Sequence, residues 1–409
     1  MRILLLTHRI PFPPNKGDKI RSFNLLKHLA SRHELHVASL IDDARDLEFV
    51  KDMRQLAKSF AYADISGRSR AISLARSLPS GAAVTVTHFY STELQEQIDA
   101  LLESADFDAV LCFSSPTAEY LFRSRHANGR LKRVRKLMDL IDVDSCKWSQ
   151  YAERSAPPMS WVYSYESRRL GAYEERIARA FDTLFLVTEQ EKTFLPPGVP
   201  REKVHALGNG VDLDYFAPLA APRAQGAAPT LVFTGAMDYW PNIDGVNWFV
   251  ESIFPRIRQA VAGTVFQIVG SRPAKEVTQL ASIDGVEVTG FVSDIRQNIG
   301  NASVCVVPLR IARGIQNKVL EAMAMGKPVV STAQAFEGIR ATVGKDVVVG
   351  VDEQSFADAV IALLHEPARA RDIGVHARAC VEAEYSWERS LQPLEGFLGV
   401  GAGVPAWAP

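Results

Sequence analysis

The chain has 409 residues, which predicts two or three domains at roughly 150 residues each. Apolar residues make up 47% and charged residues 23%, and these values exclude extended disorder and collagen-like structure. Lys and Arg number 46 against 47 Asp and Glu, so the formal net charge is −1. A nucleic-acid binder usually carries a strong basic excess, and we expect no nucleic-acid partner.

The four cysteines lack the spacings of a disulfide framework or a structural zinc site. They are Cys112, Cys146, Cys305 and Cys380. The apolar run at the N-terminus is too short for a signal-peptide core, and no later run reaches eighteen apolar residues. We therefore expect a cytoplasmic protein with reduced thiols and no metal site.

The first half alternates short apolar runs with helical patterns, which is typical of a doubly wound α/β sheet. A Pro-rich loop covers 11–19, and a helix is predicted to start near Asp18, with apolar residues at helical spacing. Strands are predicted at 3–6, 35–40, 109–113, 136–141 and 183–187.

The pattern restarts after an Ala- and Pro-rich segment at 217–229, which is interpreted as a linker or surface loop. Helices are predicted from about Asn242, over 318–325, and through 355–385 and 387–398, before a disordered tail of ten residues. Strands are predicted at 230–233, 264–269, 286–288, 304–307 and 328–331. The fold class is thus α/β, with two Rossmann-like doubly wound domains facing a cleft.

The segment 304–330 contains the strongest functional signal: a strand, a loop with two arginines and a glycine, and a helix. A helix N-terminus offers free N–H groups to an anion, and Gly314 allows a phosphate to approach the backbone. The cations Arg310, Arg313 and Lys318 would supply positive charge to a nucleotide diphosphate.

Lys318 and Glu321 are three residues apart and share one face of that helix. A carboxylate would repel phosphate, so a ribose diol is the natural partner of Glu321. The alternative interpretation is an ordinary amphipathic helix with a surface Lys–Glu pair.

Residues 321–330 (EAMAMGKPVV) closely resemble the donor-site signature of family-4-like retaining GT-B glycosyltransferases. The resemblance covers nearly the whole chain, and its other landmarks are 209–212, 290–292 and the opening 1–30. The opening resembles sugar transferases associated with exosortase (PEP-CTERM) systems. The whole-chain resemblance implies an acceptor-side domain at 1–215 and a nucleotide-sugar donor domain at 216–385. It also implies a C-terminal segment at 386–409 that returns to the first domain.

Glu321 matches the second Glu of the family's E-x7-E motif, and Arg313 stands where the first would fall. The family also often carries an Arg and a Lys after the glycine matched by Gly235, and both are absent here. We expect Arg310, Arg313 and Lys318 to take over that charge. Asn242 is either a helix cap or a donor contact.

Further site residues follow from the resemblance. Val292 and Ile295 would form a pocket for the nucleobase, or belong to a plain turn after a strand. Residues 15–21 resemble the family's flexible glycine loop: Gly17 would admit a substrate, and charged side chains would serve the donor phosphate or the acceptor. The acceptor-side residues are Lys16, Asp18, Lys19 and Arg21, with Asp18 also expected to cap the helix.

Asp142 and Asp144 follow the strand at 136–141 and are expected at its carboxyl end. There a carboxylate could orient a sugar hydroxyl or accept a proton, or cap and pair locally. Together with Lys318 and Glu321 they are the candidate catalytic residues.

The expected function is transfer of a sugar from a nucleotide-diphosphate sugar to a glycan or lipid-linked acceptor in exopolysaccharide or cell-surface polysaccharide biosynthesis, with no cofactor required. A nucleotide-sugar epimerase and a non-catalytic relative that binds nucleotide or glycan are the alternatives. Basic segments at 68–78 and 123–136 predict either peripheral contact with an anionic membrane at its inner face or a solvated charged surface.

Overall fold

The computed structural model describes residues 1–219, 228–312 and 314–399, so the expected tail and most of the expected linker lie outside the described residues. The chain divides into two compact units, Met1–Gly208 with Leu391–Pro409, and Asn209–Ser390. The division after Ser390 falls within helix α17 (Trp387–Leu398).

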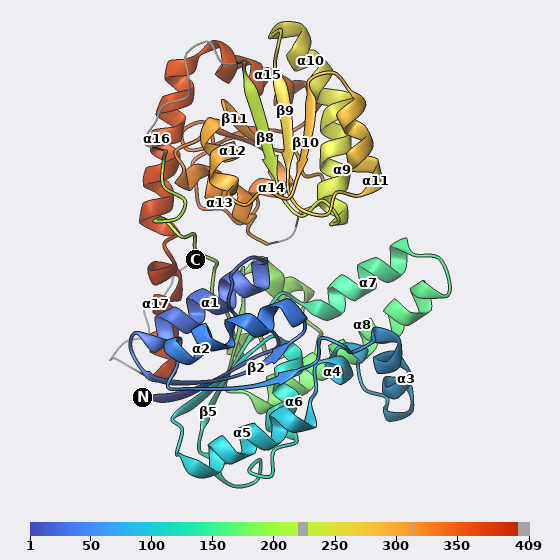
Figure 1. The fold of residues 1–409 in the computed structure, drawn as a ribbon, viewed down its shortest axis with the longest axis vertical. Helices are drawn as coiled ribbons and strands as arrows, with labels where there is room; N and C mark the ends of the chain where they lie inside the picture. Colours follow the sequence, from blue (N-terminus) through green and yellow to red (C-terminus); the bar gives the residue numbers. More distant parts are fainter. Residues whose placement is uncertain (220–227, 313, 400–409) are drawn as a thin grey trace. The chain divides into compact units, whose positions relative to one another are not determined.

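In the described part of the first unit, seven parallel strands form one sheet in the order β3-β2-β1-β4-β5-β6-β7. Figure 1 labels β2 and β5 of this sheet and the helices around it. The strands are β1 (Arg2–Thr7), β2 (Glu34–Ile41), β3 (Ser59–Asp64), β4 (Ala109–Phe113), β5 (Arg135–Ile141), β6 (Thr183–Leu186) and β7 (Val204–Ala206). The helices are α1 (Gly17–Ala30), α2 (Val50–Leu56), α3 (Arg70–Ser80), α4 (Val84–His88), α5 (Thr92–Ser104), α6 (Ala118–Phe122), α7 (Asp144–Arg154) and α8 (Met159–Ala180).

The described part of the second unit repeats this topology with a six-stranded parallel sheet in the order β10-β9-β8-β11-β12-β13. The strands are β8 (Thr230–Thr234), β9 (Val265–Val269), β10 (Val286–Gly290), β11 (Val304–Val307), β12 (Val329–Thr332) and β13 (Val348–Gly350). The helices are α9 (Trp240–Trp248), α10 (Phe254–Ala260), α11 (Lys275–Gln279), α12 (Ile295–Asn301), α13 (Asn317–Ala324), α14 (Ala333–Phe336), α15 (Glu353–His365) and α16 (Pro367–Glu384).

Each unit has a core of its own, built on central strands that are almost wholly apolar. The side chains of Ile3 to Leu6 in β1 are at most 1% exposed, and Val304 and Val306 of β11 are fully buried. Parallel strands covered by helices on both faces require such continuous apolar runs. In both units the strand order reverses beside the first strand, and ligands of such sheets bind at the carboxyl ends of the strands at that point.

Candidate functional site

The second unit brings several predicted site residues together where its strand order reverses, beside β8 and β11. Gly235 directly follows β8, and the loop after β11 leads into α13, which carries Lys318 and Glu321. Val319, Leu320 and Met323 of α13 are buried, which anchors the helix on the core and leaves Lys318 and Glu321 partly exposed. We call Gly235, Asn242, Lys318 and Glu321 the second carboxyl edge.

Lys318 is held by a neutral partner. Its Nζ donates a hydrogen bond to Asn242 Oδ1 at 2.6 Å and lies 4.5 Å from the centroid of the Phe233 ring. Asn242 Nδ2 donates to the Ala236 carbonyl oxygen at 2.9 Å, which fixes the amide with its oxygen toward the lysine. The ammonium group is therefore positioned by a neutral amide, and Glu321 is the acidic group whose attraction acts on it.

Gly235 is a packing requirement of this arrangement. A Cβ atom at this position would lie 2.7 Å from Asn242 Nδ2 and 3.3 Å from Lys318 Nζ. A side chain here would displace the amide that orients the lysine. The sequence predicted Gly235 as a donor contact, and the structure adds a local reason for the glycine.

Burial shifts both titratable groups on α13 toward neutrality. Burial lowers the pKa of Lys318 to about 7, although the attraction of Glu321 acts to raise it. Burial also raises the pKa of Glu321 to about 7, although the attraction of Lys318 acts to lower it. An anion that binds beside Lys318 would raise the lysine pKa and favour its charged form.

Asn242 does not cap a helix. Helix α9 begins at Trp240, with Tyr239 as its N-cap residue, and Asn242 lies inside its first turn at 4% exposure. The prediction placed the start of the helix two residues late, because Pro241 occupies a first-turn position where its missing N–H costs nothing. Its amide serves Lys318 and Ala236 instead.

Arg310 already has an acidic partner. Its guanidinium donates to both carboxylate oxygens of Asp244, at 2.5 and 3.0 Å, and lies 5.5 Å from the centroid of the Trp248 ring. The expectation that its charge is available to phosphate does not fit this pairing, because Asp244 lies 66 residues away and local sequence could not reveal it. Arg313 lies outside the described residues.

Three other predicted residues flank this edge. Gly314 has φ +61°, a left-handed conformation that favours glycine, and its carbonyl oxygen accepts a hydrogen bond from Gln316 Nε2 at 3.2 Å. Val292 and Ile295 are partly buried and pack against the core of the second unit, and Phe291 between Gly290 and Val292 is 78% exposed. The nucleobase pocket remains a prediction.

In the first unit, two residues expected to contact substrate are structural. Lys19 and Arg21 are each 1% exposed: Lys19 Nζ lies 2.9 Å from Asp46 Oδ2, and Arg21 binds both carboxylate oxygens of Asp139 at 2.8 and 3.2 Å. The acceptor-side prediction is wrong for both. Their acids lie 27 and 118 residues away, so local sequence gave no sign of these pairs.

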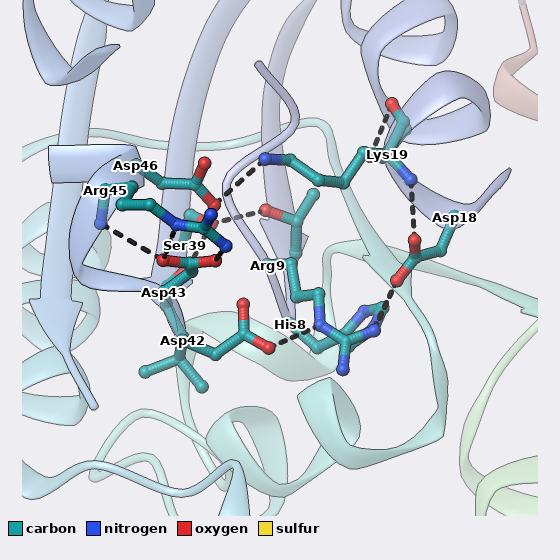
Figure 2. Close-up of polar contacts among 12 residues, drawn as sticks. His8, Arg9, Asp18, Lys19, Ser39, Asp42, Asp43, Arg45 and Asp46 are labelled. Carbon is teal, nitrogen blue, oxygen red and sulfur yellow. Dashed lines mark hydrogen bonds and ion pairs between the residues drawn. The ribbon is translucent and has the colours of Figure 1, made fainter. Parts of the chain in front are cut away.

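Lys16 and Gly17 are exposed, and a Cβ atom at Gly17 would meet nothing within 4 Å. Asp18 is not the helix cap, because α1 begins at Gly17 with Lys16 in the capping position. Its carboxylate turns instead toward two basic residues that directly follow β1, His8 and Arg9 (Figure 2).

The contacts of Asp18 neutralise its charge. Arg9 Nη1 lies 2.5 Å from Asp18 Oδ2 and Arg9 Nε lies 2.6 Å from Asp42 Oδ2, while His8 Nε2 lies 3.4 Å from Asp18 Oδ2 (Figure 2). Burial would raise the pKa of Asp18, but His8 and Arg9 hold it well below its ordinary value. His8 and Arg9 were not among the predicted site residues, although polar residues directly after a buried strand were an available signal.

Asp142 and Asp144 lie at the carboxyl end of β5, where they were expected. Asp142 reaches the surface, yet crowding by protein atoms and the charges of Glu191 and Asp144 raise its pKa to about 6. Burial raises the pKa of Asp144, against the attraction of Lys147, His8 and Arg9. We call His8, Arg9, Asp18, Asp142 and Asp144 the first carboxyl edge.

No group of three or more His, Cys, Asp or Glu is placed to hold a metal ion in the part of the chain that the structure describes. Across the same residues, no helix combines the length and the apolar character that crossing a membrane requires.

Two Rossmann-like units in one chain define the GT-B fold. Solved structures with this arrangement match nearly the whole chain. Sucrose-phosphate synthase from Thermosynechococcus elongatus matches with a TM-score of 0.69 at 19% identity, over 98% of this chain and 99% of that one. HepE of Anabaena in complex with UDP matches with a TM-score of 0.66 at 14% identity, over 98% and 100%. These likenesses show the fold.

Sequence comparison finds one family model and several related proteins. Residues 228–366, about a third of the chain, match the family model described as glycosyl transferases group 1. A GDP-mannose-dependent alpha-(1-6)-phosphatidylinositol monomannoside mannosyltransferase of Mycobacterium tuberculosis is 29% identical over 246 residues, which cover 54% of this chain and 63% of that protein. An uncharacterized 44.6 kDa protein in the cps region of Klebsiella pneumoniae is 20% identical over 96% of this chain and 98% of that one.

Proposed function

We propose that the chain is a glycosyltransferase that transfers a sugar from a nucleotide-diphosphate sugar to a glycan or lipid-linked acceptor. The observation that carries the proposal is Lys318, an ammonium group that a neutral amide positions where the strand order reverses. It lies next to Gly235, where a side chain would crowd that amide. A diphosphate is the donor group whose charge fits such a position. The match of residues 228–366 to glycosyl transferases group 1 supports it.

In the proposed reaction Lys318 stabilises the charge that develops on the departing diphosphate. Glu321, one helical turn further along α13, accepts hydrogen bonds from the ribose hydroxyls of the donor. The family resemblance implies retention of configuration at the transferred sugar, and no metal ion takes part in these two roles.

The acceptor class rests on the relatives. The Mycobacterium protein is named for a GDP-mannose donor and a phosphatidylinositol mannoside, and the Klebsiella protein for its cps region. They support a lipid-linked or glycan acceptor in the synthesis of a cell-surface polysaccharide.

Contact with an anionic membrane is part of the proposal, through helix α3. Ile72 and Leu78 are 54% and 57% exposed, and Arg70 and Arg76 on the same helix are exposed. Apolar and basic side chains on one short helix suit a headgroup layer. In flotation assays at low salt, the wild-type chain should float with phosphatidylglycerol vesicles and the Ile72→Ser/Leu78→Ser variant should not. Equal flotation of both chains would contradict membrane contact through α3.

The second basic segment, 123–136, fits a membrane less well, because acidic side chains pair with arginines in it. Arg125 Nη2 lies 2.5 Å from Glu103 Oε2, and Arg130 Nη1 lies 2.6 Å from Asp106 Oδ1. We therefore assign no membrane role to 123–136.

The test of the function is product analysis with UDP-, GDP- and ADP-sugars, with and without lipid extracts as acceptors. Acceptor-dependent consumption of one donor, with the sugar recovered on the acceptor, is the expected result. An epimerised nucleotide sugar formed from donor alone would contradict the proposal, as would binding of a donor that is never consumed.

A further inference from the structure

The first carboxyl edge contains a buried imidazole nitrogen that no group in the described residues satisfies. His8 is 6% exposed, and its Nδ1 has no hydrogen-bond partner among those residues. Ser115, which follows β4, is 1% exposed, and its Oγ is likewise without a partner there. Buried polar atoms are nearly always hydrogen-bonded, so two exceptions after adjacent strands call for an explanation.

His8 and Ser115 both follow strands that pair in the sheet, β1 and β4. Thr7 of β1 pairs with Phe113 of β4, so His8 and Ser114 each come one residue after a paired position. This is where the strand order of the first sheet reverses, between β1 and β4, and it is the place where sheets of this kind bind ligands.

The backbone at this edge is strained. Ser114 has φ +71° and Ile141, at the end of the adjacent strand β5, has φ +72°. A β-branched residue seldom adopts this conformation, and such strain concentrates at sites that bind ligands.

The imidazole ring is held in a fixed orientation. His8 lies between Phe113, whose ring centroid is 6.0 Å away and nearly parallel, and Phe89, which meets it edge-on at 5.2 Å. Its Nε2 lies 3.4 Å from Asp18 Oδ2, the carboxylate oxygen that Arg9 Nη1 also contacts (Figure 2). A carboxylate only accepts, so in the neutral ring the proton sits on Nε2 and Nδ1 presents a lone pair.

We propose that His8 and Asp18 form a hydroxyl-binding dyad, in which His8 Nδ1 accepts a hydrogen bond from a sugar hydroxyl of the substrate bound by the first unit. The inference rests on the proposed function and names the chemistry of its acceptor side. Burial excludes bulk water from Nδ1, so a hydroxyl that reaches it meets little competition. Asp18 orients the ring and is a positioning residue.

The first test reads the tautomer in the intact wild-type chain by ¹⁵N NMR of labelled histidine. The expected result is that the neutral His8 ring carries its proton on Nε2 and not on Nδ1, and that the Nδ1 signal moves when methyl α-D-mannopyranoside or methyl α-D-glucopyranoside is added. A proton on Nδ1, or a signal that neither glycoside moves, would overturn the proposal.

The second test compares two substitutions that each keep one nitrogen position of the ring. The amide of His8→Asn can accept a hydrogen bond at the position of Nδ1 but loses the contact with Asp18. His8→Gln keeps the contact with Asp18 and loses the acceptor at the position of Nδ1. We expect glycoside affinity and sugar transfer to stay within about threefold in His8→Asn and to fall about tenfold in His8→Gln, the size of one hydrogen bond. The reverse order would mean that His8 only supports Asp18.

Binding of UDP and GDP, followed by calorimetry, separates this proposal from the proposed function. Both variants should bind the nucleotide as the wild type does, because the second unit contains Lys318. If the wild-type chain binds neither nucleotide, the proposed function fails. If nucleotide binding holds and the order of the two variants is reversed, only the dyad fails. The tautomer measurement needs no variant and decides the matter should either substitution prevent folding.

Discussion

The two carboxyl edges have the same strand order but treat charge in opposite ways. In the first unit, Arg9 is shared by Asp18 and Asp42, and Lys19 and Arg21 are buried against acids. In the second unit, Lys318 has a neutral amide as its hydrogen-bond partner. One fold can therefore build an edge suited to neutral hydroxyl groups and an edge suited to an anion, depending on which partners the neighbouring elements supply.

The largest expected effect comes from breaking a buried pair of the first unit. Arg21→Met leaves Asp139 buried without its partner, which should lower the free energy of unfolding by about 3–5 kcal/mol. Thermal and urea unfolding measure this loss, and Arg21→Met/Asp139→Leu should recover much of it. Nucleotide affinity should not change in either variant. A stable Arg21→Met chain with weakened donor binding would show that the first edge binds the anion after all.

The next largest effect concerns the charge of Lys318 at the second carboxyl edge. Lys318→Met removes one charge-assisted hydrogen bond to a diphosphate, of about 1.5–3 kcal/mol, so calorimetry should show UDP or GDP binding about 10- to 100-fold weaker. Arg310→Met is the matched control and should change the affinity less than threefold, because Asp244 already pairs with Arg310. Equal losses in both variants would remove the distinction between them.

Gly235→Ala tests whether space at the second edge matters. The new Cβ would push the Asn242 amide away from Lys318, and we expect nucleotide binding about tenfold weaker with the fold retained. Gly17→Ala in the first unit is the control, since its Cβ meets nothing within 4 Å. If Gly17→Ala instead weakened binding, the substrate itself would have to lie against Gly17.

The smallest expected effect is the uptake of a proton when a diphosphate binds. With its pKa lowered to about 7, Lys318 is mostly neutral at pH 8, and a bound diphosphate raises that pKa, so binding should take up a proton. Calorimetry of UDP at pH 8 in buffers of different ionisation enthalpy should show uptake approaching one proton, falling toward zero at pH 6, where Lys318 is already charged. Glu321→Gln should keep the uptake and Lys318→Met should lose it. Proton release at pH 8 is incompatible with this assignment.

The sequence was informative where a local pattern decides the outcome. The shared helix face of Lys318 and Glu321 and the apolar strands follow from short-range patterns, and the structure places them as expected. Gly235 was singled out by the family resemblance. The edge strands β3, β7 and β13 escaped prediction because they are short, as in Val348–Gly350, or mixed in polarity, as in Ser59–Asp64.

Local sequence patterns could not reveal partners that lie far apart in the chain. Lys19 and Arg21 look like phosphate ligands until Asp46 and Asp139 are placed beside them by the sheet. The role of Asn242 depends on a lysine 76 residues away. His8 differs, because its position directly after β1 was readable.

The most direct test of the account is a crystal structure of the chain with UDP or GDP. We predict that diphosphate oxygens lie within hydrogen-bond distance of Lys318 Nζ, with the ribose hydroxyls on Glu321. A diphosphate bound instead at Lys16 or Arg9 of the first unit, with Lys318 still on Asn242 alone, would contradict the central claim.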